Sequence, residues 1–237
     1  MPRPRQDAYC ESTYTLAMPY TLHVGEKRFS SWSARPWILL RGLGIPFTER
    51  LVSLGPDKAG RLAHLPGGRV PVLEDGALQV WDSLAIVEYL AERHPGVWPA
   101  DPVARAFARS SCCEMHGGFQ ALRGEMSMDL AVRRPQRRRS EAVKADIARI
   151  EALWSEARRR FGQGGPHLFG AFSAADAYFA PVAFRFQTYG VEPKGEAGAV
   201  LRTLLAHPAV RAWELLGVKE PLLADHDLDA MYPDDPI

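Results

Sequence analysis

The sequence has few cysteines and almost no net charge, and each absence excludes whole classes of protein. The three cysteines among 237 residues are Cys10, Cys112 and Cys113, and none belongs to a CxxC pair. An odd number with two adjacent members argues against a disulfide framework and is typical of a reducing compartment, so we expect a cytoplasmic protein. A formal net charge of +1 gives no global reason to expect nucleic acid or an acidic membrane as a partner.

Long hydrophobic runs are also missing. No run approaches the roughly 18 apolar residues that a membrane-spanning helix needs, and the N-terminal stretch MPRPRQDAYCEST lacks the apolar core of a secretory signal. The histidines show no metal-ligand spacing, and no dinucleotide fingerprint, phosphate loop or pair of catalytic carboxylates occurs. We therefore expect no membrane, no nucleic acid and no metal among the partners of this chain.

The most informative stretch that is present runs from Arg69 to Leu90, with the sequence RVPVLEDGALQVWDSLAIVEYL. It predicts a strand, a tight turn at Asp75-Gly76 and a second strand from Ala77 to Trp81. Pro71 lies inside the first strand and cannot donate a hydrogen bond there, so this backbone must face something other than a neighbouring strand. A cis bond before Pro71 would leave the Val70 backbone free for a peptide-like ligand.

A helix is predicted to begin at Asp82-Ser83, directly after this hairpin. The N–H groups of its first turn have no partners within the helix and favour an anion in front of them. Strand-like pairing at Val70 beside an anion site at Ser83 suits a small anionic peptide.

The residues before this stretch predict further strands and helices of one sheet domain. A strand from Tyr20 to Val24 leads to a serine-rich run and Pro36, the pattern of a helix N-terminus. Gly44-Ile45-Pro46 ends that helix, Phe47 to Ser53 forms a second strand, and Lys58 to Leu65 forms a loop or short helix. The resulting order β-α-β-α-β-β-α predicts a single sheet with helices on both faces.

The second half of the chain carries only helical patterns. A proline-rich break from His94 to Pro102 precedes it. Apolar residues recur at helical spacing between Ser140 and Phe161, a kink is expected at Gly117-Gly118, and Ser173 to Asp176 is a capping box that opens a further helix.

These patterns predict a division of the chain into domains. We expect a disordered extension over residues 1–18, with Met18 as a candidate start, and a sheet domain over 19–98. A linker over 99–104, an all-helical domain over 105–222 and an acidic tail over 223–237 complete the division.

Taken in order, these motifs resemble the cytosolic glutathione transferases over Tyr20 to Leu222. The residues that carry the resemblance are Ser30–Arg35, Arg69–Leu73, Asp82–Ile86 and Phe172–Asp176. The resemblance implies an α/β thioredoxin-like domain followed by an all-α domain, usually in a homodimer. It also implies a transferase that binds glutathione and a small electrophilic substrate.

A serine-type site is what the resemblance implies for the chemistry. A free thiol is mostly protonated at neutral pH, and a hydroxyl donated to the sulfur at a helix N-terminus favours the thiolate. Ser30 is the first candidate for that hydroxyl, with Ser31 and Ser33 as alternatives, and each of the three could instead serve only as a helix cap. Arg35 would either support the site electrostatically or form a structural ion pair.

The same resemblance assigns the rest of the glutathione site. Val70, flanked by Arg69 and Pro71, would pair with the cysteinyl backbone of the tripeptide. The N–H and hydroxyl of Ser83 would bind the γ-glutamyl carboxylate, and Asp82 would lie nearer the amino group.

One departure from the family pattern limits the assignment, and two further cysteines are expected to be structural. Trp32 stands where the zeta-like isomerase branch, with its Ser-Ser-Cys run, carries cysteine, which argues against a maleylacetoacetate isomerase and against cysteine-type chemistry. Cys112 and Cys113 lie in a helical stretch, and we expect them to be buried small hydrophobic residues.

The helical domain would hold the second substrate. Candidate walls are the segment from Met115 to Met126 and the residues Tyr178 and Phe179, and the sequence does not identify the electrophile. An alternative function is a non-catalytic binding module, whose helical face or arginine-rich run Arg133–Arg139 contacts a protein partner. We read that run first as a solvated loop between helices.

Overall fold

The computed structural model describes residues 20–55, 58–135 and 138–221. The predicted extension over 1–18, the start at Met18 and the acidic tail over 223–237 therefore lie outside the described residues. The order of elements in the first part is the predicted one. It comprises β1 Tyr20–Gly25, α1 Ser31–Gly42, β2 Phe47–Val52, α2 Lys58–Leu62, the 3₁₀ turn η1 Pro66–Gly68, β3 Val72–Asp75, β4 Leu78–Val80 and α3 Ser83–Ala91.

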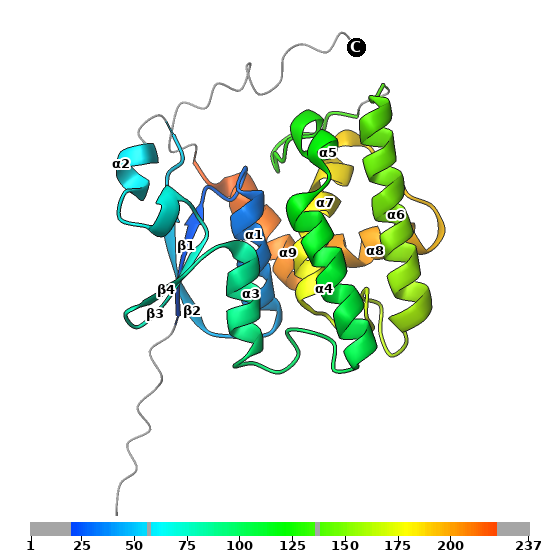
Figure 1. The fold of residues 1–237 in the computed structure, drawn as a ribbon. Coiled ribbons are helices and arrows are strands. Elements are labelled where there is room, and N and C mark those ends of the chain that lie inside the picture. Colours follow the sequence, from blue (N-terminus) through cyan, green and yellow to red (C-terminus); the bar gives the residue numbers. More distant parts are fainter. Residues whose placement is uncertain (1–19, 56–57, 136–137, 222–237) are drawn as a thin grey trace, which may run out of the picture.

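The four strands form one mixed sheet in the order β2-β1-β3-β4. β1 runs parallel to β2 and antiparallel to β3, and the Asp75-Gly76 turn joins β3 to β4 as predicted. Helices α1 and α3 cover one face of this sheet and α2 covers the other (Figure 1). Helices on both faces are therefore confirmed.

The second part is helical throughout its named elements. They are α4 Pro102–Gly117, α5 Gln120–Glu125, α6 Glu141–Phe161, α7 Ala174–Tyr189, α8 Gly195–Ala206 and α9 Pro208–Lys219. The predicted kink at Gly117-Gly118 is a break between two helices, since α4 ends at Gly117. α4 already begins at Pro102, inside the range expected for the linker, because Asp101 accepts a hydrogen bond from the Ala104 N–H at 2.7 Å.

Helix α7 occupies the centre of the molecule and joins the two parts (Figure 1). Its capping box is present, with the Asp176 carboxylate accepting from the Ser173 N–H at 3.0 Å. α7 packs against α1 of the sheet domain and against α4 and α8 of the helical domain. One hydrophobic core therefore runs from the α1 face of the sheet through α7 into the helical domain.

One expectation from the sequence, that both adjacent cysteines are buried, was wrong in detail. Cys112 is buried, but Cys113 is exposed, so only the first is a buried hydrophobic residue. Adjacent residues on a helix point about 100° apart, and α4 offers only one face to the core. None of the described helices has the length and apolar character needed to cross a membrane.

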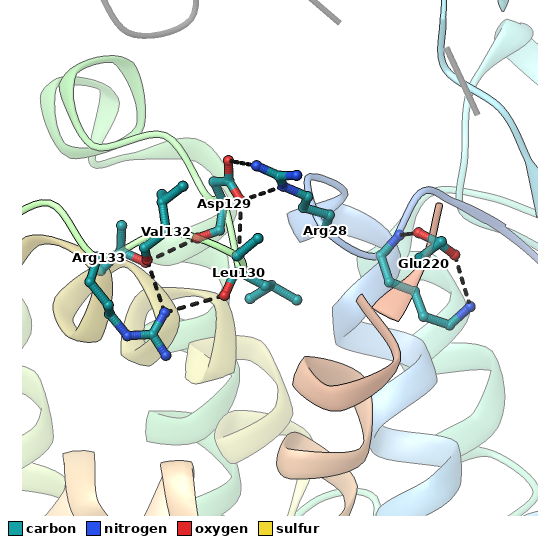
Figure 2. A network of polar contacts seen from close by, with 9 residues as sticks. Arg28, Asp129, Leu130, Val132, Arg133 and Glu220 are labelled. Carbon is teal, nitrogen blue, oxygen red and sulfur yellow. Dashed lines mark hydrogen bonds and ion pairs between the residues drawn. The ribbon is translucent and has the colours of Figure 1, made fainter. Parts of the chain in front are cut away.

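The described residues of the arginine-rich run lie outside helices and strands between α5 and α6, as predicted. At its described ends the side chains bind the fold itself: Arg133 donates to the Leu130 carbonyl and to Glu214, and Arg139 donates to the Tyr189 carbonyl. Figure 2 shows the contacts of Arg133 with the Leu130 and Val132 carbonyls. These two guanidinium groups therefore stabilise the loop instead of projecting freely into solvent.

Candidate functional site

The serine-rich run begins α1 and lies at the end of β1. Ser30 is the residue before the helix, yet its side chain caps no N–H of the first turn. Its hydroxyl instead donates to the Ser33 hydroxyl at 2.8 Å, and Ser33 accepts the Gly25 N–H at 3.1 Å. Ser33 is fully buried, whereas Ser30 keeps 7% of its surface exposed. Ser33 therefore fixes the loop from within, and Ser30 lies nearer the surface.

The helical domain anchors this loop from the other side (Figure 2). The Arg28 guanidinium donates two hydrogen bonds to the Asp129 carboxylate, at 2.6 and 2.8 Å, and the Leu130 N–H donates to the Arg28 carbonyl at 3.3 Å. The Lys27 N–H donates to the carboxylate of Glu220, beyond α9, at 2.6 Å. The position of Ser30 therefore depends on residues of both halves of the chain.

Arg35 is a buried cation between two aromatic rings. Its guanidinium lies 4.1 Å from the ring centre of Trp32 and 4.4 Å from that of Tyr178, and only 1% of the residue is exposed. The Nε and Nη1 atoms have no hydrogen-bond partner. Burial lowers the pKa of Arg35, and interaction with Tyr178 works in the opposite direction. Arg35 is therefore neither a surface residue nor a member of an ion pair with any described carboxylate.

A ring of polar contacts closes the N-terminus of α3 against the helical domain. Asp82 caps α3 by accepting the Leu84 N–H at 2.9 Å. Ser83 is fully buried, with its hydroxyl 3.1 Å from that of Tyr178, which in turn lies 3.1 Å from His116 Nδ1. His116 Nε2 is 3.3 Å from the second oxygen of Asp82. Both groups that the sequence assigns to the γ-glutamyl end therefore already contact the protein itself.

Tyr178 stays protonated in this ring at neutral pH. Burial raises the pKa of Tyr178 to about 12. Its hydroxyl can therefore donate one hydrogen bond and accept another, which is what its positions next to Ser83 and His116 require. A phenol with this pKa cannot act as the base that deprotonates a thiol near neutral pH.

The Val70–Pro71 bond is cis, as the sequence predicts, and a second cis bond joins Trp81 and Asp82. β3 begins only at Val72, so Val70 stands outside the sheet ladder. Continuing the register of β1 and β3 places Val70 beside Gly25, and continuing that of β3 and β4 places Asp82 beside Pro71. The serine loop, the Val70 edge and the start of α3 therefore meet at one end of the sheet.

The predicted site residues separate into a surface layer and a buried layer. Exposed or half-buried residues are Ser31, Arg69, Val70 and Asp82. Buried residues are Ser30, Ser33, Arg35, Pro71 and Ser83. A ligand on this surface would touch the first group directly, and it could reach the hydroxyls of Ser30 and Ser83 only if they exchanged their present partners, Ser33 and Tyr178. Ser33, Arg35 and Pro71 support the surface from beneath.

The predicted wall for the second substrate needs correction. Met115, Met126 and Phe179 are core residues with almost no exposed surface, so they cannot line a cleft. On the same segments, half-buried His116 and Arg123 lie against the Trp32 ring, at 5.1 and 5.2 Å from its centre. No periodic signal marks this contact in the sequence, because the residues that meet come from α1, α4 and α5.

Ser31 is the second candidate hydroxyl, and it also contacts the helical domain. It is half-buried, and its oxygen lies 3.5 Å from Nη2 of Arg185, a residue of α7. In the part of the chain that the structure describes, no group of three or more His, Cys, Asp or Glu side chains could hold a metal ion.

Comparisons with known proteins agree with this architecture. Residues 29–93 match the family described as "Glutathione S-transferase, N-terminal domain", and residues 140–214 match "Glutathione S-transferase, C-terminal domain". A glutathione transferase homologue from Burkholderia gl BGR1, solved with bound glutathione, is 25% identical with a TM-score of 0.62, and the match covers 84% of this chain and 97% of that one.

Two curated relatives differ in what their names state. A stringent starvation protein A homologue from Haemophilus ducreyi is 26% identical over 71% of this chain and 76% of its own length. A probable maleylacetoacetate isomerase from Caenorhabditis elegans is 33% identical over 39% of this chain and 44% of its own length. The first name states no enzymatic activity and the second names an isomerase.

Proposed function

Because the chain belongs to the glutathione S-transferase family, we propose that it binds glutathione and holds its thiol as a thiolate beside a serine hydroxyl at the start of α1. The thiolate then attacks a small electrophile, which is either conjugated or isomerised. The bound glutathione of the Burkholderia relative supports the ligand. The observation that carries the proposal is the position of Ser30, the residue directly before α1, whose hydroxyl leaves the first-turn N–H groups of the helix uncapped.

The serine pair offers a route to the thiolate. In the structure Ser30 donates to Ser33, and Ser33 accepts the Gly25 N–H. If the two hydroxyls rotate so that Ser33 donates to Ser30, the Ser30 proton becomes free for the sulfur. That hydrogen bond and the N-terminus of α1 both stabilise negative charge. A lowering of the thiol pKa by about two units would correspond to about 2.7 kcal/mol.

The tripeptide would extend from the serine loop to the start of α3. The Val70 backbone lies outside the ladder and can pair with the cysteinyl unit, with Arg69 exposed next to it. Asp82 is exposed and can bind the γ-glutamyl amino group if its carboxylate exchanges His116 for the ligand. Ser83 would have to exchange Tyr178 for the ligand carboxylate in the same way. We place the electrophile against Trp32, His116 and Arg123.

We also propose that the protein is a cytoplasmic homodimer. Leu78 and Trp81 are 49% and 54% exposed and stand at the edge strand directly before Asp82. Exposed apolar side chains at such an edge favour burial against a second copy of the chain. Light scattering on the purified protein should give twice the monomer mass of 26.3 kDa, and a monomer at all concentrations tested would contradict this point.

The second candidate function is a non-catalytic binding module with this fold. Two observations favour it: the relative whose name states no activity, and the contacts by which Tyr178 and His116 already engage Ser83 and Asp82. In such a module the ring at α3 would stay closed and glutathione would not enter.

Serine-to-alanine variants test the proposed function. We expect calorimetric titration to show glutathione binding, and we expect Ser30→Ala to lower turnover with a model electrophile by about tenfold or more, since a lost donor to a developing charge has effects of this size. The ultraviolet absorbance of the bound thiolate should shift to higher pH in the same variant. Ser110→Ala, on the exposed surface of α4, is the matched control and should change neither.

Other outcomes assign the site differently. Loss of activity in Ser31→Ala with full activity in Ser30→Ala would transfer the role to Ser31. Absence of both glutathione binding and thiolate absorbance in the parent protein would refute the transferase and support the binding module.

A further inference from the structure

A cavity lies beneath α2, on the face of the sheet opposite to α1 and α3. Its volume is about 760 Å³, and it is lined by His23, Arg50, Leu51, Val52, Ser53, Arg61, His64 and Glu74. None of these residues belongs to the candidate site at the start of α1 and α3. His23 alternates along β1 with Leu22 and Val24, which face the main core, so its side chain points toward α2.

The basic groups of this cavity come from three separate elements. Arg50 stands beside His23 in the register of β1 and β2, whereas Arg61 belongs to α2 and His64 to the turn after it. Leu62 and Leu65 pack on Val72 of β3 and thereby hold α2 over the sheet. The fold thus brings two arginines and two histidines, distant in sequence, to one hollow.

The acidic group in the cavity is already occupied. Glu74 accepts from Gln79 Nε2 at 3.1 Å, and its carboxylate lies 3.1 Å from His23 Nε2. Burial acts to raise the pKa of Glu74, but the contacts with Gln79 and His23 outweigh it, so the pKa is lowered and the carboxylate stays ionised. Glu74 is therefore engaged by Gln79 and His23 at hydrogen-bond distance, and Arg50 interacts with the same carboxylate electrostatically to a smaller extent.

Neither arginine has a partner at hydrogen-bond distance among the residues that the structure describes, and the interaction of Arg50 with Glu74 is a longer-range electrostatic one. Arg50 and Arg61 are exposed, and neither forms a hydrogen bond or an ion pair within residues 20–55, 58–135 and 138–221. Ser53 adds a hydroxyl that accepts the Gly55 N–H at 3.4 Å and retains its own proton to donate. The hollow therefore offers several hydrogen-bond donors and positive charge, with its single carboxylate engaged.

We propose that this cavity binds the phosphate group of a small phosphorylated molecule. Guanidinium groups bind phosphate oxygens with two parallel hydrogen bonds each, which makes a pair of arginines on facing elements a suitable clamp. The cavity is larger than one phosphate ion and falls within the range of small-molecule sites, roughly 300 to 1,000 Å³. The rest of the ligand would lie along Leu51 and Val52, the apolar part of the lining.

Calorimetric titration of the full chain with inorganic phosphate and with pyrophosphate, at constant ionic strength set by chloride, tests the proposal. We expect saturable binding of pyrophosphate at one site per chain. Arg50→Gln and Arg61→Gln should each weaken it about tenfold or more, because a hydrogen bond to a charged group contributes about 1.5 to 3 kcal/mol. Arg202→Gln removes an exposed arginine on α8 and should leave binding unchanged. Unchanged thermal unfolding verifies that each variant is folded.

Three results would overturn the proposal. They are the absence of saturable binding of either anion, equal weakening in all three variants, and competition between pyrophosphate and glutathione for one site. The first two readouts do not involve glutathione, so they remain decisive if the proposed transferase function fails.

Discussion

The pair formed by Arg28 and Asp129 gives the sharpest test of how the site is held. The side chain of Asp129 is fully buried and that of Arg28 is 15% exposed. Breaking a buried ion pair by removing one partner costs about 3 to 5 kcal/mol, because the remaining charge loses its compensation. We expect Arg28→Met to lie at the upper end of this range, since within the described part of the chain the Asp129 carboxylate would keep only the Ala131 N–H as a hydrogen-bond donor, at 2.9 Å.

Asp129→Ala should cost less, about 3 kcal/mol, because the partly exposed Arg28 can reach water. The double variant should recover about 1 to 3 kcal/mol relative to the sum of the single variants, as residues in contact do. Urea unfolding followed by far-ultraviolet circular dichroism measures all three free energies. Glu141→Ala, which breaks an exposed ion pair with Lys144 on α6, is the control and should cost less than about 1 kcal/mol.

The same variants examine the link to the site, because Arg28 stands two residues before Ser30. We expect Asp129→Ala to raise the KM for glutathione more than it lowers kcat, since the loop is displaced while the hydroxyl remains. Single losses below about 1 kcal/mol, or free energies that simply add in the double variant, would refute the claim that this pair holds the loop.

Four further predictions follow from buried and titrating groups. Arg35→Met should change the free energy of unfolding in urea by less than about 2 kcal/mol, because the loss of two cation–π contacts is offset by the removal of two buried N–H groups without partners. The same variant should lower turnover with glutathione about tenfold or more. A large loss of stability with full activity would make Arg35 structural. The pKa of Tyr178, raised to about 12 by burial, means that the unfolded state releases this proton first, so stability should fall between pH 10 and pH 12, and less steeply in Tyr178→Phe. Peptide mapping after alkylation should find Cys113 modified well before Cys112, whose pKa burial raises well above its usual value. Burial and a neighbouring histidine lower the pKa of His207, so stability should fall as the pH drops below about 6.5. The variant His207→Asn keeps a cap for α9. It should flatten that fall in a pH series of thermal unfolding.

Features set by neighbouring residues could be predicted from the sequence. The Asp75-Gly76 turn, the capping box from Ser173 to Asp176 and the cis bond before Pro71 each depend on a few adjacent residues, and all three are present. The order of strands and helices follows from the same local signals, because periodicity and turn residues determine which segment forms which element.

Features that join distant residues could not be predicted in this way. Arg28 and Asp129 are 101 positions apart and Ser83 and Tyr178 are 95 apart, and nothing in either neighbourhood marks the other. The three serines at the start of α1 show the same limit. They share one local pattern, and only the contact of Ser33 with the Gly25 N–H separates the supporting serine from the more accessible ones.

The choice between the two proposed functions reduces to one exchange of partners. Asp82 and Ser83 lie where we place the γ-glutamyl end of the tripeptide. In the structure their side chains contact His116 and Tyr178 instead. A hydroxyl such as that of Ser83 binds one strong acceptor at a time, so glutathione must replace contacts that the helical domain now makes. Removing those contacts should therefore strengthen glutathione binding if the site is a working transferase site with a closed resting state. If the ring is instead the permanent end of a binding module, His116→Ala and Tyr178→Phe should weaken the junction of the two domains and bring no ligand affinity.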